Sequence, residues 1–87
     1  MATVFIPALL RKLTGGRESI IAKGRTVGQI IDDIERRFPG FRTQMVENGE
    51  LKPSIAVSID GEVAAGGLRD PVDESSEVHF IPALGGG

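Results

Sequence analysis

The sequence predicts a small α+β domain in which one amphipathic helix covers one face of a mixed β-sheet. A chain of 87 residues holds one modest core, because a protein of this size buries roughly 63% of its unfolded surface. Residues 26–38 carry apolar side chains at helical period. The apolar segments before and after them alternate with period two and are separated by glycine and proline turns, which is typical of strands.

The first half of the chain predicts a hairpin. Residues 3–10 are expected to form its first strand, because two interleaved and mostly apolar sets alternate there, as in a central strand. Residues 14–16, Thr-Gly-Gly, predict a turn, since glycine adopts a positive φ without steric cost. Residues 17–23 then predict a second strand around Ile20 and Ile21.

The segment that follows carries the strongest helix signal. Thr26 and Gln29 have the spacing of a capping box, in which each side chain satisfies a free backbone donor at the helix start. Apolar residues then recur at i, i+3, i+4, i+7 and i+11 and form one stripe. They are Val27, Ile30, Ile31, Ile34 and Phe38.

Charged residues are predicted to lie on the solvated side of this helix. The i,i+4 spacing predicts two ion pairs, Asp32 with Arg36 and Asp33 with Arg37. The Pro-Gly pair at 39–40 predicts the end of the helix, because proline cannot continue it.

The second half of the chain predicts three further strands. After an irregular helical turn over 41–49, with Met45 and Val46 directed inward, residues 54–59 alternate as a half-buried strand. The Asp-Gly pair at 60–61 predicts a tight turn, with a short strand behind it near 62–64. An irregular loop follows, and 78–82 is the predicted last strand.

The predicted order is strand, strand, helix, strand, short strand, strand. Two hairpin-like halves around one helix indicate a β-grasp (ubiquitin-like) architecture, with a mixed sheet of four to five strands packed on one main helix. The first and last strands are expected to lie parallel at its centre. Residues 1–82 are predicted to form the domain, and 83–87 a flexible glycine tail.

Composition excludes several classes of site and partner. The chain has no cysteine, so disulfides, thiolate nucleophiles, zinc-thiolate sites and iron–sulfur clusters are excluded. No signal peptide and no apolar run of membrane-spanning length are found, so we expect a cytoplasmic protein without a membrane partner. Nucleic acid is not expected, because the net charge is −2 and the basic residues are dispersed.

The charge is unevenly spread along the chain. Residues 1–43 hold eight Lys/Arg and four Asp/Glu, whereas residues 44–87 hold two and eight. A solvated surface and a polar docking face for a partner both fit this asymmetry. An acidic cluster in the second half lacks the ligand order of a calcium loop, so no metal site is predicted. It comprises Asp70, Asp73, Glu74 and Glu77.

The terminal Gly85-Gly86-Gly87 is the most informative feature. Ordering glycine costs more backbone entropy than ordering any other residue, so an ordinary domain gains nothing from three in a row. From Ala83 to Gly87 an extended chain reaches about 16–18 Å, at ~3.3–3.6 Å per residue, and fits a narrow channel. Its ionised carboxylate is a poor electrophile. Adenylation by ATP activates it, and sulfur can then displace AMP to leave a thiocarboxylate.

The motifs resemble the ThiS, MoaD and CysO family of ubiquitin-like sulfur carrier proteins. The ending VHFIPALGGG at 78–87 is similar to the family's apolar strand, proline turn and terminal Gly-Gly. The segment 6–11, followed by 14–16, resembles the CysO members most. Residues 26–28 and 38–40 match the family's helix and its end. The extra glycine before the usual pair departs from the pattern and affects the tail length.

The resemblance implies a carrier rather than an enzyme, with the C-terminal carboxylate of Gly87 adenylated and then thiocarboxylated. It implies no bound cofactor, because ATP is used by a ubiquitin-activating-enzyme-like adenylating protein. For CysO-like members it implies a pyridoxal-phosphate-dependent cysteine synthase as acceptor and a metalloprotease that trims the cysteine. For MoaD-like members it implies the large subunit of molybdopterin synthase. Cysteine biosynthesis is the first expectation; molybdopterin synthesis, protein modification through isopeptide bonds and a plain interaction domain are the alternatives.

Partner contacts are predicted beside the tail. Phe5 and Ile81, on neighbouring central strands, are expected to expose apolar area on one open face. His79, the only histidine, should face away from the core, and no triad partner is spaced to make it catalytic. The predicted partner-binding residues are Phe5, His79, Ile81, Pro82, Ala83, Leu84, Gly85 and Gly86.

Overall fold

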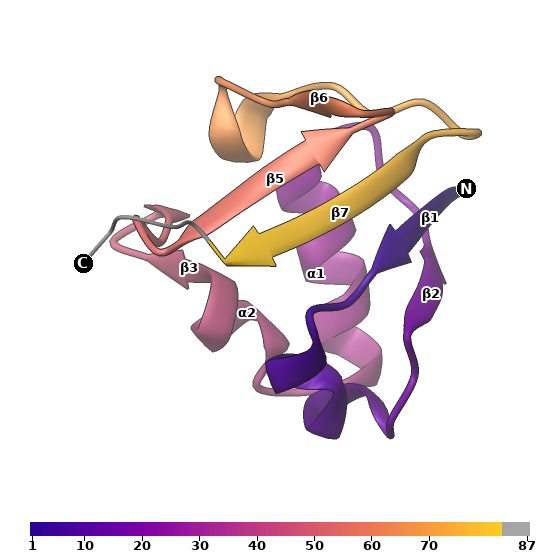
Figure 1. Ribbon diagram of the computed structural model, residues 1–87, viewed down its shortest axis with the longest axis vertical. Coiled ribbons are helices and arrows are strands. Elements are labelled where there is room, and N and C mark those ends of the chain that lie inside the picture. The colour runs from indigo at the N-terminus through magenta and orange to yellow at the C-terminus, as the bar shows by residue number, and fades with distance from the viewer. Residues whose placement is uncertain (83–87) are drawn as a thin grey trace.

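The computed structural model describes residues 1–82 as a five-stranded mixed sheet with α1 lying across one of its faces (Figure 1). The elements in chain order are β1 (Ala2–Phe5), the 3-10 helix η1 (Ala8–Thr14), β2 (Ser19–Ala22), α1 (Val27–Arg37), α2 (Phe41–Met45), β3 (Val46–Glu47), β4 (Glu50–Leu51), β5 (Ile55–Ile59), β6 (Glu62–Val63), the 3-10 helix η2 (Gly67–Arg69) and β7 (Glu77–Pro82). This arrangement confirms the predicted β-grasp architecture.

The sheet order is β2-β1-β7-β5-β6. The central strands β1 and β7 are parallel, as predicted, and the other pairs are antiparallel. The register places Val4 beside Val78 and Val57 beside Phe80, and all four side chains are buried. They pack against the stripe of α1, whose Val27, Ile30, Ile31 and Ile34 are fully buried. The core therefore lies between α1 and the inner face of the sheet.

The start of α1 has the predicted cap with one difference. Thr26 Oγ1 accepts the N–H of Gln29 at 3.2 Å, as in a capping box. The return bond is displaced by one residue, because Gln29 Oε1 accepts the N–H of Arg25, at 2.8 Å, rather than that of Thr26. The helix ends at Arg37, and Gly40 follows with a φ of 103°, which confirms the predicted stop.

The expected strand over 3–10 is wrong beyond Phe5. The last bond to β2 is donated by the N–H of Ile6 to the carbonyl of Glu18, and the chain then turns into η1. Pro7 accounts for the change, because it has no N–H to extend the ladder. Its carbonyl instead accepts the N–H of Leu10. Leu9, assigned to the strand, is 84% exposed on this 3-10 helix.

The segment after α1 also differs from the expectation. Only residues 41–45 are helical, and a small hairpin of β3 and β4 follows. Asn48 and Gly49 connect these strands with φ values of 54° and 78°, which is the conformation an Asn-Gly hairpin turn requires. Met45 is buried and Val46 half-buried, as predicted. The Asp60-Gly61 turn is confirmed by positive φ at both residues.

One of the two predicted ion pairs forms. Arg37 lies 3.1 Å from Asp33, as expected from the i,i+4 spacing. Arg36, however, also bonds to Asp33, at i+3, and Asp32 pairs with Arg42 of α2 at 2.6 Å. Helix α2 packs beside α1, so its arginine competes for Asp32. Across residues 1–82, no helix has the length and apolar character needed to cross a membrane.

Candidate functional site

The open face of the sheet, opposite α1, is the candidate site. Within residues 1–82 no element packs over it, and the strands cross it side by side (Figure 1). Directly paired residues share a face, so the registers place one side chain from each strand in a transverse row. This central row comprises Ser19, Phe5, His79, Ser58 and Val63, from edge to edge.

Phe5 and His79 are stacked at the middle of the central row. Their ring centroids are 4.3 Å apart and their planes are inclined by 11°. The His79 side chain is 42% exposed, and its Nε2 lies 3.9 Å from a carboxylate oxygen of Glu77 on the same strand. The structure therefore confirms that His79 faces away from the core, and it shows in addition that the ring lies against Phe5.

Exposed aliphatic side chains surround this stack on the same face. Ile81, which pairs with Ala56, is 44% exposed. Ile21 and Val63, which are 57% and 75% exposed, were not predicted as site residues. Period-two alternation from buried Ile20 could have placed Ile21 outward. Locating Val63 requires the register across the Asp-Gly turn, which pairs it with Ser58.

Strand β7 ends beside these residues. The neighbouring strand β1 runs in the same direction as β7. On the other side of β7, Pro82 pairs with Ile55 at the start of β5. At the other end, the N–H of Glu77 donates to Asp60 Oδ1, and the N–H of Asp60 donates to the carbonyl of Glu77, both at 2.9 Å. The strand is therefore paired on both edges as far as His79, and with β5 from there to Pro82. The predicted site residues Ala83, Leu84, Gly85, Gly86 and Gly87 lie outside the described residues.

The four residues of the acidic cluster do not share one environment. Asp70 Oδ2 accepts the N–H of Gly66 at 2.8 Å, which closes the loop around η2. Asp73, Glu74 and Glu77 are exposed, as expected for a solvated surface. In the part of the chain that the structure describes, no three His, Asp or Glu side chains converge as a metal site requires.

Comparison with known proteins agrees with this geometry. The ThiS family profile matches residues 4–87. The sulfur carrier protein CysO of Mycobacterium tuberculosis is 32% identical over 90 residues, which span 98% of this chain and 97% of that protein. A chain in the crystal structure of the Amycolatopsis orientalis BexX/CysO complex superposes with a TM-score of 0.92 at 39% identity, over 100% of both chains.

A more distant relative is also similar. Small archaeal modifier protein 3 of Haloferax volcanii is 30% identical over 64 residues, which span 71% of this chain and 70% of that protein. The family match covers almost the whole chain, and the CysO proteins share its fold and length. The chain therefore belongs to the ThiS family of ubiquitin-like sulfur carrier proteins, which are carriers and not themselves catalysts.

Proposed function

We propose that this chain carries sulfur as a thiocarboxylate on Gly87 and donates it in biosynthesis, first of all that of cysteine. The observation that carries the proposal is the match to the ThiS family through Gly87 itself. Strand β7 adds a physical argument, because β1 pairs with it as far as His79 and β5 pairs with it as far as Pro82. A partner that binds the sheet thus meets the terminal residues from a fixed starting point.

The proposed chemistry begins with adenylation. An oxygen of the ionised Gly87 carboxylate attacks the α-phosphorus of ATP, a P–O bond forms, and pyrophosphate leaves. Sulfide sulfur then attacks the acyl carbon, a C–S bond forms, and the C–O bond to AMP breaks. The net change is sulfur for oxygen at the terminus. The adenylating protein supplies positioning and charge stabilisation, and this chain supplies the reacting group.

The open face is the proposed partner-binding surface. The Phe5–His79 stack and the exposed Ile81 give a partner an apolar, preformed contact next to the end of β7. We include Pro82, Ala83, Leu84, Gly85 and Gly86 in this surface, because a partner that binds Gly87 encloses the residues before it. Five extended residues span about 16–18 Å, so the adenylation site lies within that distance of the docked sheet.

The proposed sulfur acceptor is a pyridoxal-phosphate-dependent cysteine synthase, with a metalloprotease that releases the cysteine. The full-length similarity to CysO supports this pathway. Similarity to a small archaeal modifier protein favours a second candidate, in which Gly87 forms isopeptide bonds with lysines of other proteins. Transfer to the large subunit of molybdopterin synthase stays a prediction from the motifs alone.

Intact-mass analysis tests the proposal. The purified chain is incubated with ATP, sulfide and the adenylating protein, and a gain of about 16 Da is expected for sulfur in place of oxygen. Methionine oxidation adds the same nominal mass, so the controls are a reaction without ATP and a chain with a C-terminal amide. A gain in both controls, or no gain with ATP, contradicts the proposal. High-mass conjugates on lysine would support the modifier instead.

A further inference from the structure

The outer edge of β2 carries the further inference. This strand is at one end of the sheet, and within residues 1–82 it pairs only with β1. The bond from Ile6 N–H to the Glu18 carbonyl sets the antiparallel pattern. In that pattern, the N–H and C=O groups of Ser19, Ile21 and Lys23 point away from β1. Such an unpaired row is a ready template for another strand.

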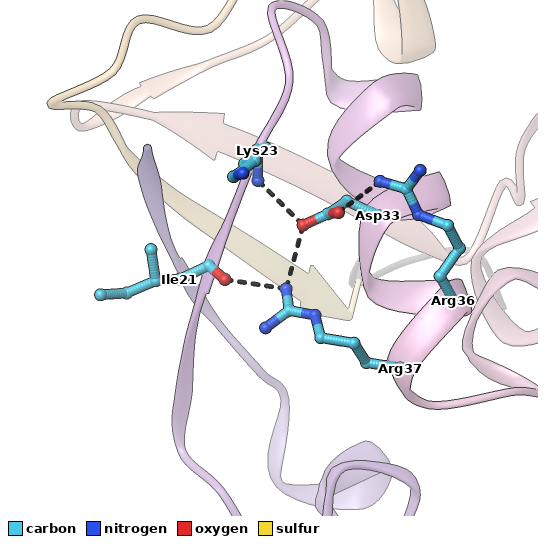
Figure 2. A network of polar contacts seen from close by, with 5 residues as sticks. All are labelled: Ile21, Lys23, Asp33, Arg36 and Arg37. Atoms are coloured by element: carbon cyan, nitrogen blue, oxygen red, sulfur yellow. Dashed lines mark hydrogen bonds and ion pairs between the residues drawn. The ribbon is translucent and has the colours of Figure 1, made fainter.

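Two side chains of α1 reach this edge from the side (Figure 2). Asp33 Oδ2 accepts the N–H of Lys23 at 2.9 Å, and Arg37 Nη2 donates to the carbonyl of Ile21 at 2.8 Å. The same guanidinium nitrogen donates to Asp33 Oδ2 at 3.1 Å. Arg36 bonds to the other carboxylate oxygen. The Asp33 side chain is only 14% exposed and that of Arg37 is 45% exposed, so the carboxylate lies against the strand and the guanidinium covers it from the solvent side.

The two contacts form together because residues four apart on α1 and residues two apart on β2 are separated by nearly the same distance. Four residues of an α-helix rise about 6 Å, and two residues of a β-strand rise about 6.8 Å. Asp33 and Arg37 are four apart on α1, and the backbone groups that they contact belong to residues two apart on β2. The acid meets a donor and the base meets an acceptor, so the pair presents to β2 the two groups that an adjacent strand would present.

We propose that the Asp33–Arg37 pair is an edge cap, which prevents β2 from pairing with β2 of a second copy of this chain. The edge is self-complementary about Ile21. In an antiparallel pair of copies, Ile21 would lie opposite Ile21, and Ser19 opposite Lys23. The two exposed isoleucines, at 57% each, would then pack side by side. The cap occupies the Ile21 carbonyl and the Lys23 N–H, which this pairing needs.

Sedimentation velocity over rising protein concentration tests the edge cap. The native chain is expected to stay monomeric, and the D33A/R37A variant to approach twice the monomer mass. The matched control is D32A/R42A, which also removes one acid and one base in contact at 2.6 Å. Neither side chain of that pair contacts β2 in the described hydrogen bonds, so the control should stay monomeric. The test needs no ATP and no partner, so it is independent of the proposed function.

A third variant identifies the surface involved. Ile21→Pro removes an N–H that points away from β1, so it blocks edge pairing and spares the ladder to β1. Added to D33A/R37A, it should restore the monomer. The edge cap is overturned if D33A/R37A stays monomeric with native circular dichroism, or if its dimer persists in the triple variant. If D33A/R37A does not fold, the single variant Arg37→Ala replaces it, because this change alone frees the Ile21 carbonyl. A folded Arg37→Ala variant that stays monomeric also overturns the edge cap.

Discussion

Phe5 and His79 join the first and last strands of the chain through stacked rings, with centroids 4.3 Å apart. The two residues are register partners in the parallel pair at the centre of the sheet. The stack fixes the position of His79 on the open face, although neither residue belongs to the core between sheet and helix. His79 also lies on the strand that leads to the terminal residues, three positions before Pro82, where β7 ends.

The stack should contribute measurable coupling energy. In a double-mutant cycle of Phe5→Ala and His79→Ala, we expect a coupling free energy of about 0.5–1.5 kcal/mol, because aromatic pairs contribute that much beyond area burial. Urea denaturation of the four proteins measures it. A cycle on Phe5 and Thr3, which are on the same strand, gives the control. Coupling indistinguishable from that control would show that the rings lie together without stabilising each other.

Ile81 is predicted to contribute to partner binding and little to stability. Its side chain is 44% exposed, so Ile81→Asp should change the free energy of unfolding by no more than about 1 kcal/mol. The charge would be buried against a docked partner, and affinity for the adenylating protein should fall by about tenfold or more. Calorimetric titration measures this. Leu9→Asp, at an 84% exposed side chain off the sheet face, is the control, and an equal loss there would contradict the assignment.

Gly24 is predicted to be intolerant of any side chain. A Cβ there would lie 2.8 Å from the backbone nitrogen of Ile30 and 2.9 Å from Gln29 Cβ, at a φ of 155°. Because backbone of α1 is the obstacle, Gly24→Ala should destabilise the fold by roughly 2–4 kcal/mol. Gly49→Ala is the control, since its φ is 78° but nothing lies within 4 Å of the added carbon. If denaturation shows similar losses of stability in the two variants, the strain of a positive φ, and not the close approach of α1, causes the destabilisation.

Two carboxylates should make the fold sensitive to acid. Bonds from the N–H groups of Arg42 and Gly40 lower the pKa of Glu35. The pKa of Asp33 is lowered first by the Lys23 N–H, then by Arg36 and Arg37, against an opposing effect of burial. A lowered pKa in the folded state adds stability above the unfolded value, and this stability is lost as pH falls through the folded value.

The expected window lies below about pH 4.5, near the ordinary carboxyl pKa values. Thermal melts over a pH series should show the native chain losing stability there. The D33N/E35Q variant should be less stable at neutral pH and should lose less on acidification. Glu62→Gln, at an exposed residue on β6, is the control. Parallel curves for all three proteins would contradict the assignment of the acid limb to Asp33 and Glu35.

The sequence predicted those elements that are determined by residues close together in the chain. The stripe from Val27 to Ile34 follows from helical period, and its burial is complete. Pro7 was a local signal for the strand end, and Asn48-Gly49 was one for the β3–β4 hairpin. The apolar run over residues 3–10 outweighed the first signal, and the irregular helical turn expected over 41–49 included the second.

The features that depend on tertiary contact could not be predicted in the same way. The i,i+4 spacing predicted that Asp33 and Arg37 meet, but their bonds to β2 depend on how α1 lies against that strand. Asp32 pairs with Arg42 because α2 packs beside α1, which no spacing within one helix indicates. The central row likewise needs the register of four strand pairs, so Val63 was missed although Phe5 and His79 were identified.

Whether Gly87 carries the sulfur is decided by fragmentation mass spectrometry of the chain after reaction with ATP, sulfide and the adenylating protein. The chain has no cysteine and two methionines, so a newly acquired reactive sulfur has no competing thiol. We expect the gain of about 16 Da in every fragment that contains Gly87 and in no fragment that ends before it. A gain confined to fragments that contain Met1 or Met45, or an unchanged Gly87 in a chain that still donates sulfur, would contradict it.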